Sequence, residues 1–349
     1  MRILHISFSL ENAGKENMLV DIAAEQQKLG HCVAIAVINN RVDQSILNRI
    51  PATVSIYLLN RVRGSRNPLP FIRLFDILHR RFRPDVVHAH DAHIGGLIRK
   101  LKSVRTVLTI HDNGYPTEPM QSFLKLFSIS DSVKTDVESR SNLKCTTIYN
   151  GINFNSVKNI KRKSSSDSKI NLIQVSRLNH HKKGQDILLS AMYNLVSYKS
   201  LNNICLTFAG SGESYQFLLS LAQSLNLQNH LIFLGNKPRE WIYDNLCDYD
   251  IFVQPSRFEG FGLALVEALA AKLIAVSSDN TGSAEVLDNG KYGILFKNGD
   301  HMDLVDKIQS AIELITTNES APLVEEAYGY VKNKYNIQKT AAAYLDNYS

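Results

Sequence analysis

Short apolar runs rich in β-branched residues alternate with segments of helical hydrophobic spacing through the N-terminal half of the chain. The runs that predict strands are RILHISF, CVAIAVI, TVSIYLL, DVVHAH and TVLTIH, and the helical patterns cover residues 15–30, 68–82 and 92–101. Nearly continuous apolar strands separated by helices are typical of a parallel sheet that is covered on both faces. The pattern therefore predicts a doubly wound α/β domain.

The alternation stops at residues 155–169, NSVKNIKRKSSSDSK, which are polar, basic and rich in serine. It then resumes, and a second set of predicted strands follows: INLIQVS, ICLTFAG, LIFLG, DIFVQPS, LIAVSS and YGILF. A chain of 349 residues is long enough for two such domains. We assign the first domain to residues 1–155, a linker to 156–169 and the second domain to 170–335.

Several classes of protein are disfavoured by simple features of the chain. The N-terminus, MRILHISFSL, reaches polar residues too soon for a signal peptide, and no run approaches the ~18 apolar residues of a membrane span. The four cysteines are scattered without a CxxC pair, which predicts buried, reduced thiols in a cytoplasmic protein.

The net charge of +6 is concentrated in residues 61–105, which contain eleven Lys and Arg residues and three Asp residues. Within them, PFIRLFDILHRRFRPD (70–85) has helical apolar spacing, with Arg73, Arg80, Arg81 and Arg83 elsewhere on the helix. One interpretation is an ordinary surface helix packed on a sheet. The other is a patch that contacts anionic lipid headgroups or a phosphorylated substrate, with possible membrane association. No recognition motif accompanies the charge, so we expect no nucleic-acid partner.

Ligands of open α/β sheets bind beyond the carboxyl ends of the strands, so the residues that follow each strand are the candidates for chemistry. In the second domain, Arg177 follows the first strand and Lys183 stands at the start of the next helix. Two cations beside a helix N-terminus suit a diphosphate. Gly210, in FAGSGES, adds a glycine-rich turn that is a weak signal alone.

Two carboxylates stand eight positions apart in RFEGFGLALVEALAA (257–271), a largely apolar segment. We expect a helix to begin near Gly262 or Leu263, which places Glu259 in the preceding loop and Glu267 inside the helix. Backbone amides around Gly260, Phe261, Gly262 and Leu263 would then bind an anion, while the two acids accept hydrogen bonds from sugar hydroxyls. The alternatives are compensation of the helix terminus for Glu259 and an ion pair for Glu267.

Together these turns, with a further one at SSDNTGSAEVL (277–287), indicate a nucleotide-diphosphate ligand. The chain also resembles, over nearly its whole length, the retaining GT-B glycosyltransferases of family 4. The motifs that carry the resemblance are the Glu259/Glu267 pair, NAGKEN (12–17), PDVVHAHD (84–91), TIHD (109–112), IYNGIN (148–153), SRL…KKG (176–184), AGSGE (209–213) and GSAEV (282–286).

The resemblance implies two doubly wound, Rossmann-like domains that face a central cleft, with a C-terminal helix (336–349) that crosses back to the N-terminal domain. It also implies a retaining, metal-independent transferase that moves a hexose or N-acetylhexosamine from a UDP- or GDP-sugar to a glycan acceptor. For the acceptor we expect a lipid-linked glycan of bacterial surface polysaccharide (O-antigen or capsule) assembly, at the inner face of the cytoplasmic membrane.

Residue roles also follow from the resemblance. Arg177 and Lys183 would hold the donor diphosphate, with the amides of 260–263 lining it. Glu267 would bind the ribose and Glu259 the transferred sugar. In the N-terminal domain, the Gly14 loop would close over the diphosphate and His111 would assist reaction of the sugar. Four positions depart from the residues common in the family: Ala13, Ser176, Lys272 and Ile274.

Three alternatives remain open. Three histidines and an aspartate in HAHDAH (88–93) suggest metal ligands, since His88 and His90 would lie on one face of a strand. A GT-B sugar-nucleotide epimerase would share the fold and the donor but would need no acceptor. A non-catalytic scaffold would bind the nucleotide sugar without either reaction. A dehydrogenase is disfavoured because SFSLENAGKEN lacks the G-x-G-x-x-G turn.

Overall fold

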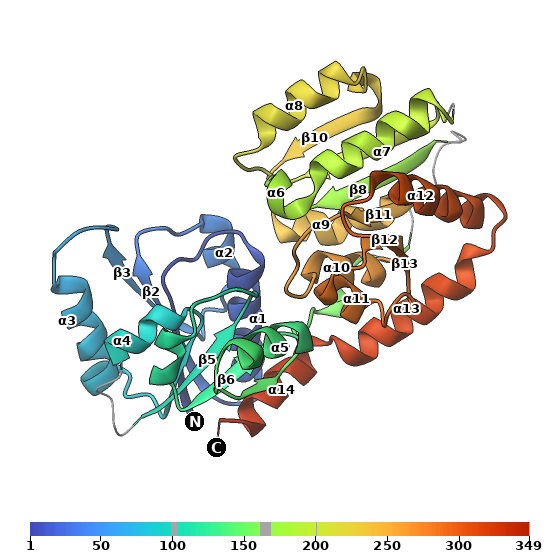
Figure 1. The fold of residues 1–349 in the computed structure, drawn as a ribbon. Coiled ribbons are helices and arrows are strands. Elements are labelled where there is room, and N and C mark those ends of the chain that lie inside the picture. Colours follow the sequence, from blue (N-terminus) through green and yellow to red (C-terminus); the bar gives the residue numbers. More distant parts are fainter. Residues whose placement is uncertain (99–103, 161–168, 200, 349) are drawn as a thin grey trace. The chain divides into compact units, whose positions relative to one another are not determined.

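The computed structural model describes residues 1–98, 104–160, 169–199 and 201–348, and Figure 1 shows its elements. The chain divides into two compact units. Unit 1 is Met1–Ile152 with Tyr335–Ser349, and unit 2 is Asn153–Lys334. The chain thus enters unit 2 a few residues before the expected boundary at 155. Most of the expected linker, residues 161–168, lies outside the described residues.

Unit 1 contains a parallel sheet in the order β3-β2-β1-β4-β5-β6-β7. Its strands are β1 (Arg2–Ser7), β2 (Cys32–Asn39), β3 (Ser55–Arg61), β4 (Val86–Ala89), β5 (Arg105–Ile110), β6 (Lys125–Ser128) and β7 (Cys145–Thr147). The five strands expected from the sequence are confirmed. The last two were not predicted, because runs of four and three residues carry too little alternation to be recognised.

The helices of unit 1 are α1 (Gly14–Lys28), α2 (Gln44–Arg49), α3 (Leu69–Asp76), α4 (Gly95–Ile98), α5 (Asp131–Arg140) and α14 (Ile337–Asp346). The helix expected over 68–82 is confirmed as α3 followed by one π-helical turn, Ile77–Arg81. The helix expected over 92–101 begins as a 3₁₀ turn, Ala92–Ile94, which leads into α4, and 99–101 lie outside the described residues.

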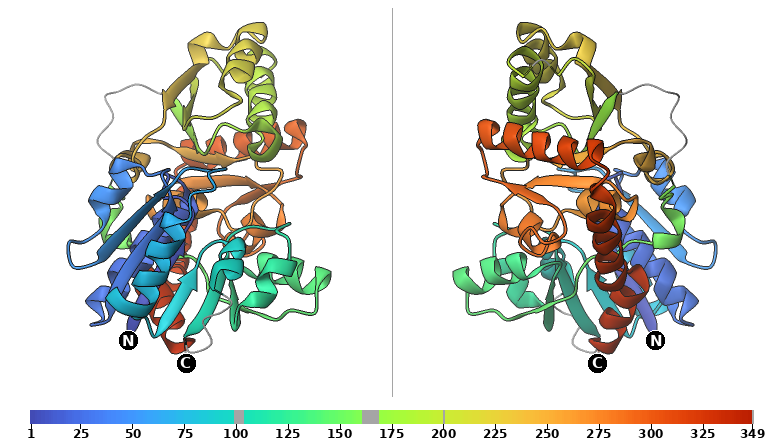
Figure 2. Two further views of the ribbon diagram at one scale, coloured as in Figure 1. Left: turned by 90° about the vertical axis from the view of Figure 1, so that its left-hand side faces the viewer. Right: turned by 90° about the vertical axis from the view of Figure 1, so that its right-hand side faces the viewer.

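The C-terminal helix α14 joins unit 1, where it packs against α1 (Figure 2). The returning chain is tied by two backbone hydrogen bonds, from Ile152 N–H to the Tyr335 carbonyl (2.9 Å) and from Ile337 N–H to the Ile152 carbonyl (3.1 Å). Tyr344 and Tyr348 are fully buried or nearly so. Burying two large aromatic rings stabilises this docking, provided that their hydroxyls find partners.

Unit 2 repeats the architecture with a parallel sheet in the order β10-β9-β8-β11-β12-β13. The strands are β8 (Ile170–Val175), β9 (Ile204–Ala209), β10 (Leu231–Gly235), β11 (Ile251–Gln254), β12 (Ile274–Ser278) and β13 (Ile294–Phe296). The helices are α6 (His180–Lys183), α7 (Gln185–Ser197), α8 (Tyr215–Ser224), α9 (Arg239–Asn245), α10 (Leu263–Ala270), α11 (Thr281–Val286), α12 (His301–Thr316) and α13 (Ser320–Lys334). The prediction of two parallel-sheet α/β domains is confirmed.

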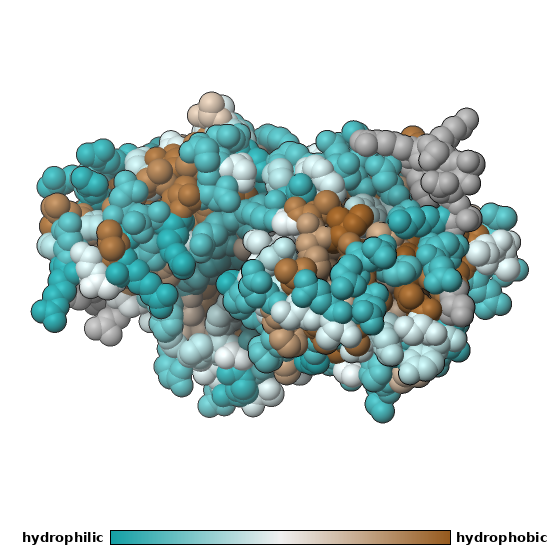
Figure 3. All heavy atoms as spheres, turned by 90° about the horizontal axis from the view of Figure 1, so that it is seen from above, coloured by the Kyte–Doolittle hydropathy of each residue, from teal (hydrophilic) through white to brown (hydrophobic). Residues whose placement is uncertain are grey.

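Most side chains on the face shown in Figure 3 are hydrophilic, with smaller hydrophobic patches between them. Three of the four cysteines are buried, but Cys32 is exposed. The expectation that all four thiols are buried is therefore wrong for Cys32, because this residue opens β2 at the exposed end of the strand. Among the described residues, no helix has the length and apolar character needed to span a membrane.

Candidate functional site

The strand order of unit 2 reverses between β8 and β11, since β9 and β10 lie on one side of β8 and β12 and β13 lie beyond β11. Loops that leave the carboxyl ends of two such strands run in opposite directions, which leaves a crevice for a ligand. Arg177 and Lys183 follow β8, Gly210 follows β9, and Glu259 follows β11. The candidate residues of this unit thus emerge at one edge of one sheet.

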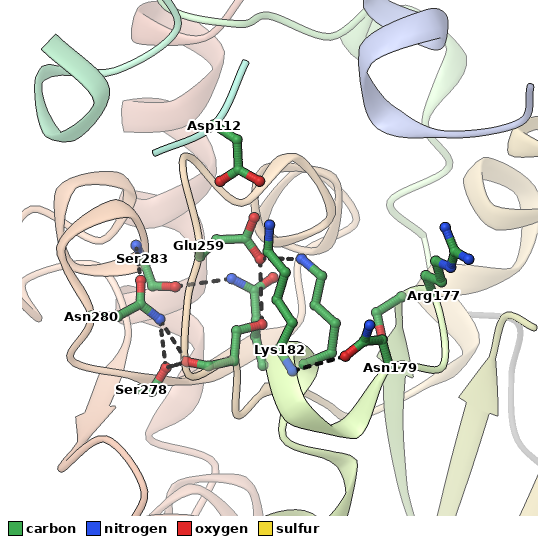
Figure 4. Close-up of polar contacts among 12 residues, drawn as sticks. Asp112, Arg177, Asn179, Lys182, Glu259, Ser278, Asn280 and Ser283 are labelled. Atoms are coloured by element: carbon green, nitrogen blue, oxygen red, sulfur yellow. Dashed lines mark hydrogen bonds and ion pairs between the residues drawn. The ribbon is translucent and has the colours of Figure 1, made fainter. Parts of the chain in front are cut away.

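Lys183 and Glu259 form the central contact of this edge, with 2.7 Å between Nζ and Oε2. Lys183 ends the short helix α6, which Asn179 caps by accepting a hydrogen bond from the Lys182 amide. Ser256 donates a further hydrogen bond to Glu259 (3.3 Å). Figure 4 shows these contacts around Glu259. The structure therefore brings together two of the residues singled out from the sequence.

Helix α10 begins at Leu263, and Gly262 is its N-cap, as expected. Gly262 has φ of +97°, a backbone conformation that residues other than glycine rarely adopt. A Cβ atom there would also lie 3.0 Å from Gln254 Nε2. The loop Gly260–Gly262 is buried, and its backbone leads into the first turn of α10. The first turn of a helix presents amides that lack intrahelical partners, so the loop geometry suits an anion.

Glu267 lies inside α10 and is buried, and its Oε1 accepts a hydrogen bond from Arg239 Nε at 3.1 Å. Arg239 opens α9 and also lies over the ring of Tyr243. The ion pair weighed as an alternative for Glu267 is therefore present. Sequence reasoning did not find Arg239, because nothing in the spacing of two residues on different helices indicates that they meet.

Arg177 follows β8 but turns toward the next loop, where its guanidinium is 3.2 Å from Glu213. Figure 4 shows its side chain directed away from Glu259. A backbone hydrogen bond and the Arg177 charge lower the pKa of Glu213, which also accepts from Asn179. The neighbouring Gly210 is required by packing, because a Cβ atom there would lie 1.9 Å from the Ser176 carbonyl oxygen.

A second ion pair that the sequence did not indicate connects the loop after β11 to the helices α6 and α7 that follow β8. Arg257 donates two hydrogen bonds of 2.8 Å to the Asp186 carboxylate and a third to the His180 carbonyl. Burial alone would raise the pKa of Asp186, but the hydrogen bond and charge of Arg257 lower it overall. This bidentate pair fixes the orientation of the Arg257 guanidinium close in sequence to Glu259.

In unit 1 the strand order reverses between β1 and β4, and Gly14 and His111 lie beyond the same sheet edge. Gly14 is the first residue of α1, and nothing in its surroundings would oppose a Cβ atom. The adjacent Lys15 pairs with Asp91 at 2.7 Å, and Asp91 also accepts from the Phe8 amide (3.0 Å). Asp91, which the sequence indicated only as part of a metal-ligand cluster, thus connects the ends of β1 and β4 to α1.

His111 directly follows β5 and lines a pocket within unit 1, together with Asp91, His90 and Tyr115. Burial, and then the charge of Lys15, lower the pKa of His111 to about 3. The imidazole is therefore neutral at pH 7. A neutral histidine donates a hydrogen bond from one ring nitrogen and accepts one on the other, and it contributes no positive charge to the pocket.

The histidines of HAHDAH are separated by the fold. His93 is exposed, whereas His88 and His90 are buried with His5 of β1, and ring nitrogens of these three residues lie within 4.8 Å of one another. Each ring nitrogen of the three already has a hydrogen-bond partner. A metal ion would therefore have to replace several of these bonds.

Comparison with known proteins places these features in a family. Residues 156–328 match the model of glycosyl transferases group 1, and residues 13–156 match glycosyltransferase family 4. A *Saccharomyces cerevisiae* phosphatidylinositol N-acetylglucosaminyltransferase GPI3 subunit is 28% identical over 66% of this chain and 56% of its own length. The *Bacillus anthracis* N-acetyl-α-D-glucosaminyl L-malate synthase is 27% identical over 51% of this chain and 45% of its own length. The chain thus spans about half the length of these relatives.

Solved structures share the fold at low sequence identity. *Anabaena* Alr3699/HepE in complex with UDP and glucose superimposes with a TM-score of 0.82 at 19% identity, over 99% of both chains. Sucrose-phosphate synthase from *Thermosynechococcus elongatus* gives 0.81 at 16% identity, over 99% of this chain and 98% of the other. With both family models matched in succession along two parallel-sheet domains, the chain belongs to the GT-B glycosyltransferases of family 4.

Proposed function

We propose that this protein is a retaining glycosyltransferase that moves a hexose or N-acetylhexosamine from a nucleotide-diphosphate sugar to a glycan acceptor. The observation that carries the proposal is the Lys183–Glu259 pair, 2.7 Å apart, at the strand switch of unit 2 beside the start of α10. A cation, a carboxylate and helix-terminal amides in one place match the diphosphate and hydroxyl groups of such a donor. UDP is the expected nucleotide, since the similar *Anabaena* structures contain UDP and UDP-glucose.

In this proposal, Lys183 and Arg177 hold the diphosphate and the amides of residues 260–263 line it. For Arg177 this requires the exposed side chain to leave Glu213. Glu259 accepts hydrogen bonds from hydroxyls of the transferred sugar. Glu267 accepts hydrogen bonds from the ribose hydroxyls and keeps its hydrogen bond from Arg239, because a carboxylate has about four acceptor positions.

The chemistry follows from charge. When the sugar–phosphate bond breaks, negative charge develops on the departing diphosphate, and Lys183, Arg177 and the helix terminus stabilise it without a metal ion. The anomeric carbon becomes oxocarbenium-like, and the acceptor hydroxyl attacks from the face that the diphosphate leaves. Retention results. The hydroxyl proton passes to the departing phosphate oxygen, which lies on the same face.

For the acceptor we propose a lipid-linked glycan, of the kind used in bacterial surface polysaccharide assembly. Helix α3 supports this proposal, because it buries Leu74 but leaves Leu69, Ile72 and Phe75 more than half exposed. The exposed arginines of residues 61–83 lie next to them in the sequence. An apolar face beside basic residues is suited to the surface of an anionic membrane.

The experiment that tests the function is a thermal-shift screen against UDP, GDP and a panel of their sugars, followed by a transfer assay with the sugar that binds. Binding at a hundred times the dissociation constant stabilises the folded state by about 2.7 kcal/mol. We expect a UDP-sugar to raise the melting temperature and to be consumed only with an acceptor. Interconversion of the sugar without an acceptor would instead identify an epimerase, and binding without either reaction would identify a scaffold.

A further inference from the structure

Unit 1 contains a set of buried polar side chains on one face of its sheet. His5 of β1 and His88 of β4 are direct neighbours in the strand register, and both are fully buried. His90 is two residues beyond His88, so it lies on the same face. Gln26 of α1 is also fully buried. Burying so many polar groups is costly unless each one has hydrogen-bond partners, so their arrangement is informative.

The first half of the arrangement leads inward from the pocket. His111 Nε2 is 3.1 Å from His90 Nδ1, and His90 Nε2 is 3.0 Å from His5 Nδ1. His5 Nε2 is in turn 2.8 Å from Gln26 Oε1. These three contacts run through the rings of His90 and His5 and join a residue that lines the pocket to a glutamine on α1.

The second half leads on to the C-terminal helix. Gln26 Nε2 donates to the Tyr348 hydroxyl (2.9 Å), which lies 2.7 Å from His88 Nδ1. His88 Nε2 is 2.7 Å from the Thr109 hydroxyl, and Thr109 donates to the Tyr344 hydroxyl (3.0 Å). The chain of hydrogen bonds is therefore continuous from His111 to α14, and Gln26 is at its middle.

Gln26 gives this chain a direction. An amide oxygen only accepts, so His5 must donate from Nε2 and, as a neutral imidazole, accept on Nδ1. His90 must then donate from Nε2 and accept on Nδ1, and His111 must donate from Nε2. Neutral rings are expected, because burial lowers the pKa of His5 to about 4 and that of His90 well below its usual value.

We propose that Gln26 is a positioning residue that holds His5, His90 and His111 as Nε2–H tautomers and so leaves Nδ1 of His111 as a hydrogen-bond acceptor for the pocket. The ligand group that such a nitrogen recognises is a donor, and in the proposed reaction this is a substrate hydroxyl. That last step rests on the proposed function. The tautomer assignment does not, because it follows from the hydrogen-bond chain.

Nitrogen-15 NMR of the full chain with labelled histidine tests the assignment directly, since two-bond couplings distinguish Nε2–H from Nδ1–H rings. At pH 7 we expect His5, His88, His90 and His111 each as a single Nε2–H tautomer. Gln26→Met should convert the rings of His5, His90 and His111 to mixtures of both tautomers. Gln27→Met, the adjacent substitution on α1, should leave them unchanged. A wild-type His111 protonated on Nδ1 would overturn the proposal without any variant.

The same variants separate positioning from a merely structural role. If the sugar-transfer reaction is confirmed, Gln26→Met should lower kcat about tenfold or more while the dissociation constant for UDP stays within twofold of wild type. Because the NMR measurement needs no substrate, absence of transferase activity would refute the proposed function but leave the tautomer result intact. Unchanged tautomers and unchanged kcat in Gln26→Met would together overturn the positioning role.

Discussion

Lys183 Nζ lies 2.7 Å from Glu259 Oε2, so the cation and the carboxylate proposed to bind the two halves of one donor are themselves paired. This pairing predicts opposite effects of two substitutions on binding of UDP alone. Lys183→Ala should weaken UDP binding about 10- to 100-fold, the loss expected for a charge-assisted hydrogen bond. Glu259→Ala should leave it unchanged or tighten it, since a negative charge next to the diphosphate disappears. Isothermal titration measures both.

Both variants should nevertheless lose transfer, by a factor of about 100 or more, because each removes a group that stabilises the reacting donor. Lys307→Ala on α12 is the matched control, since Lys307 pairs only weakly with Asp303 at 3.9 Å and belongs to a helix outside the site. Wild-type turnover in Glu259→Ala or Lys183→Ala would contradict the assignment of these residues to the transferase site. Equal weakening of UDP binding in both would refute the division of labour between them.

The buried pair between Arg239 and Glu267 predicts an effect on stability rather than on chemistry alone. Their side chains are 6% and 9% exposed. Replacing Arg239 with Met leaves a buried carboxylate without this partner, which typically costs about 3–5 kcal/mol. Urea unfolding of the chain should show a correspondingly lower midpoint for unit 2. The Lys307–Asp303 pair is half-buried and 3.9 Å apart, and it should contribute less than about 1 kcal/mol, so Lys307→Ala should leave the midpoint nearly unchanged.

The buried histidines predict that unit 1 is sensitive to mild acid. Burial lowers the pKa of His5 to about 4 and of His111 to about 3, and those of His88 and His90 well below normal. In the unfolded chain they take up protons below about pH 6.5. The unfolded state then binds more protons than the folded one, so stability is retained above pH 6.5 and lost as the pH falls toward 4.

Each buried histidine contributes a slope of up to about 1.4 kcal/mol per pH unit in this range. Among the neighbouring groups, burial raises the pKa of Tyr344 and Tyr348, and against the effect of burial the charge of Asp91 raises the pKa of Lys15, so these groups do not titrate in this range. Burial also raises the pKa of Glu16 beside Lys15, which offsets part of the loss. Hydrogen exchange at pH 7 and pH 5, corrected for intrinsic rates, should therefore show loss of protection in β1 and β4 before β8 and β11. Equal loss in both units would contradict this expectation.

How much of the fold and of the site the sequence predicts depends on how far apart along the chain the interacting residues lie. Strands and the start of α10 follow from local features: buried β-branched runs and the backbone freedom of Gly262. The contacts between residues on different helices or strands do not follow from local features. Arg239 and Glu267 lie on different helices, and His5 meets His90 across 85 positions, so only the folded sheet reveals that they touch. Both carboxylates and Lys183 were recognisable from the sequence, but Arg239, which holds Glu267, was not.

The two strands that the pattern missed, β6 and β7, show the same limit at short range, because three or four residues contain barely two alternations. Cys32 was misassigned for a related reason. Its strand is buried from the second residue onward, and position alone decides that the first residue is exposed. Strand ends are set by tertiary packing and not by the composition of the strand.

The exposed apolar and basic residues of α3 and the turn after it predict binding to anionic membranes. Neutralising the exposed Arg80, Arg81 and Arg83 together should lower the partition coefficient for phosphatidylglycerol-containing vesicles about a hundredfold, since each basic residue near such a surface contributes about 1 kcal/mol. Vesicle flotation measures this coefficient. The control replaces Lys297, Lys307 and Lys332 of unit 2 with Gln, which removes the same charge elsewhere.

A second variant separates electrostatic attraction from insertion. Ile72 and Phe75 are 57% and 63% exposed, so Ile72→Ser with Phe75→Ser should leave the fold intact and remove the apolar contact with the membrane. We expect this variant to float less with anionic vesicles even at low salt, whereas the arginine variant should lose the salt dependence of binding. If both variants float as well as wild type, α3 serves only to cover the sheet through Leu74, and the acceptor need not be held at a membrane.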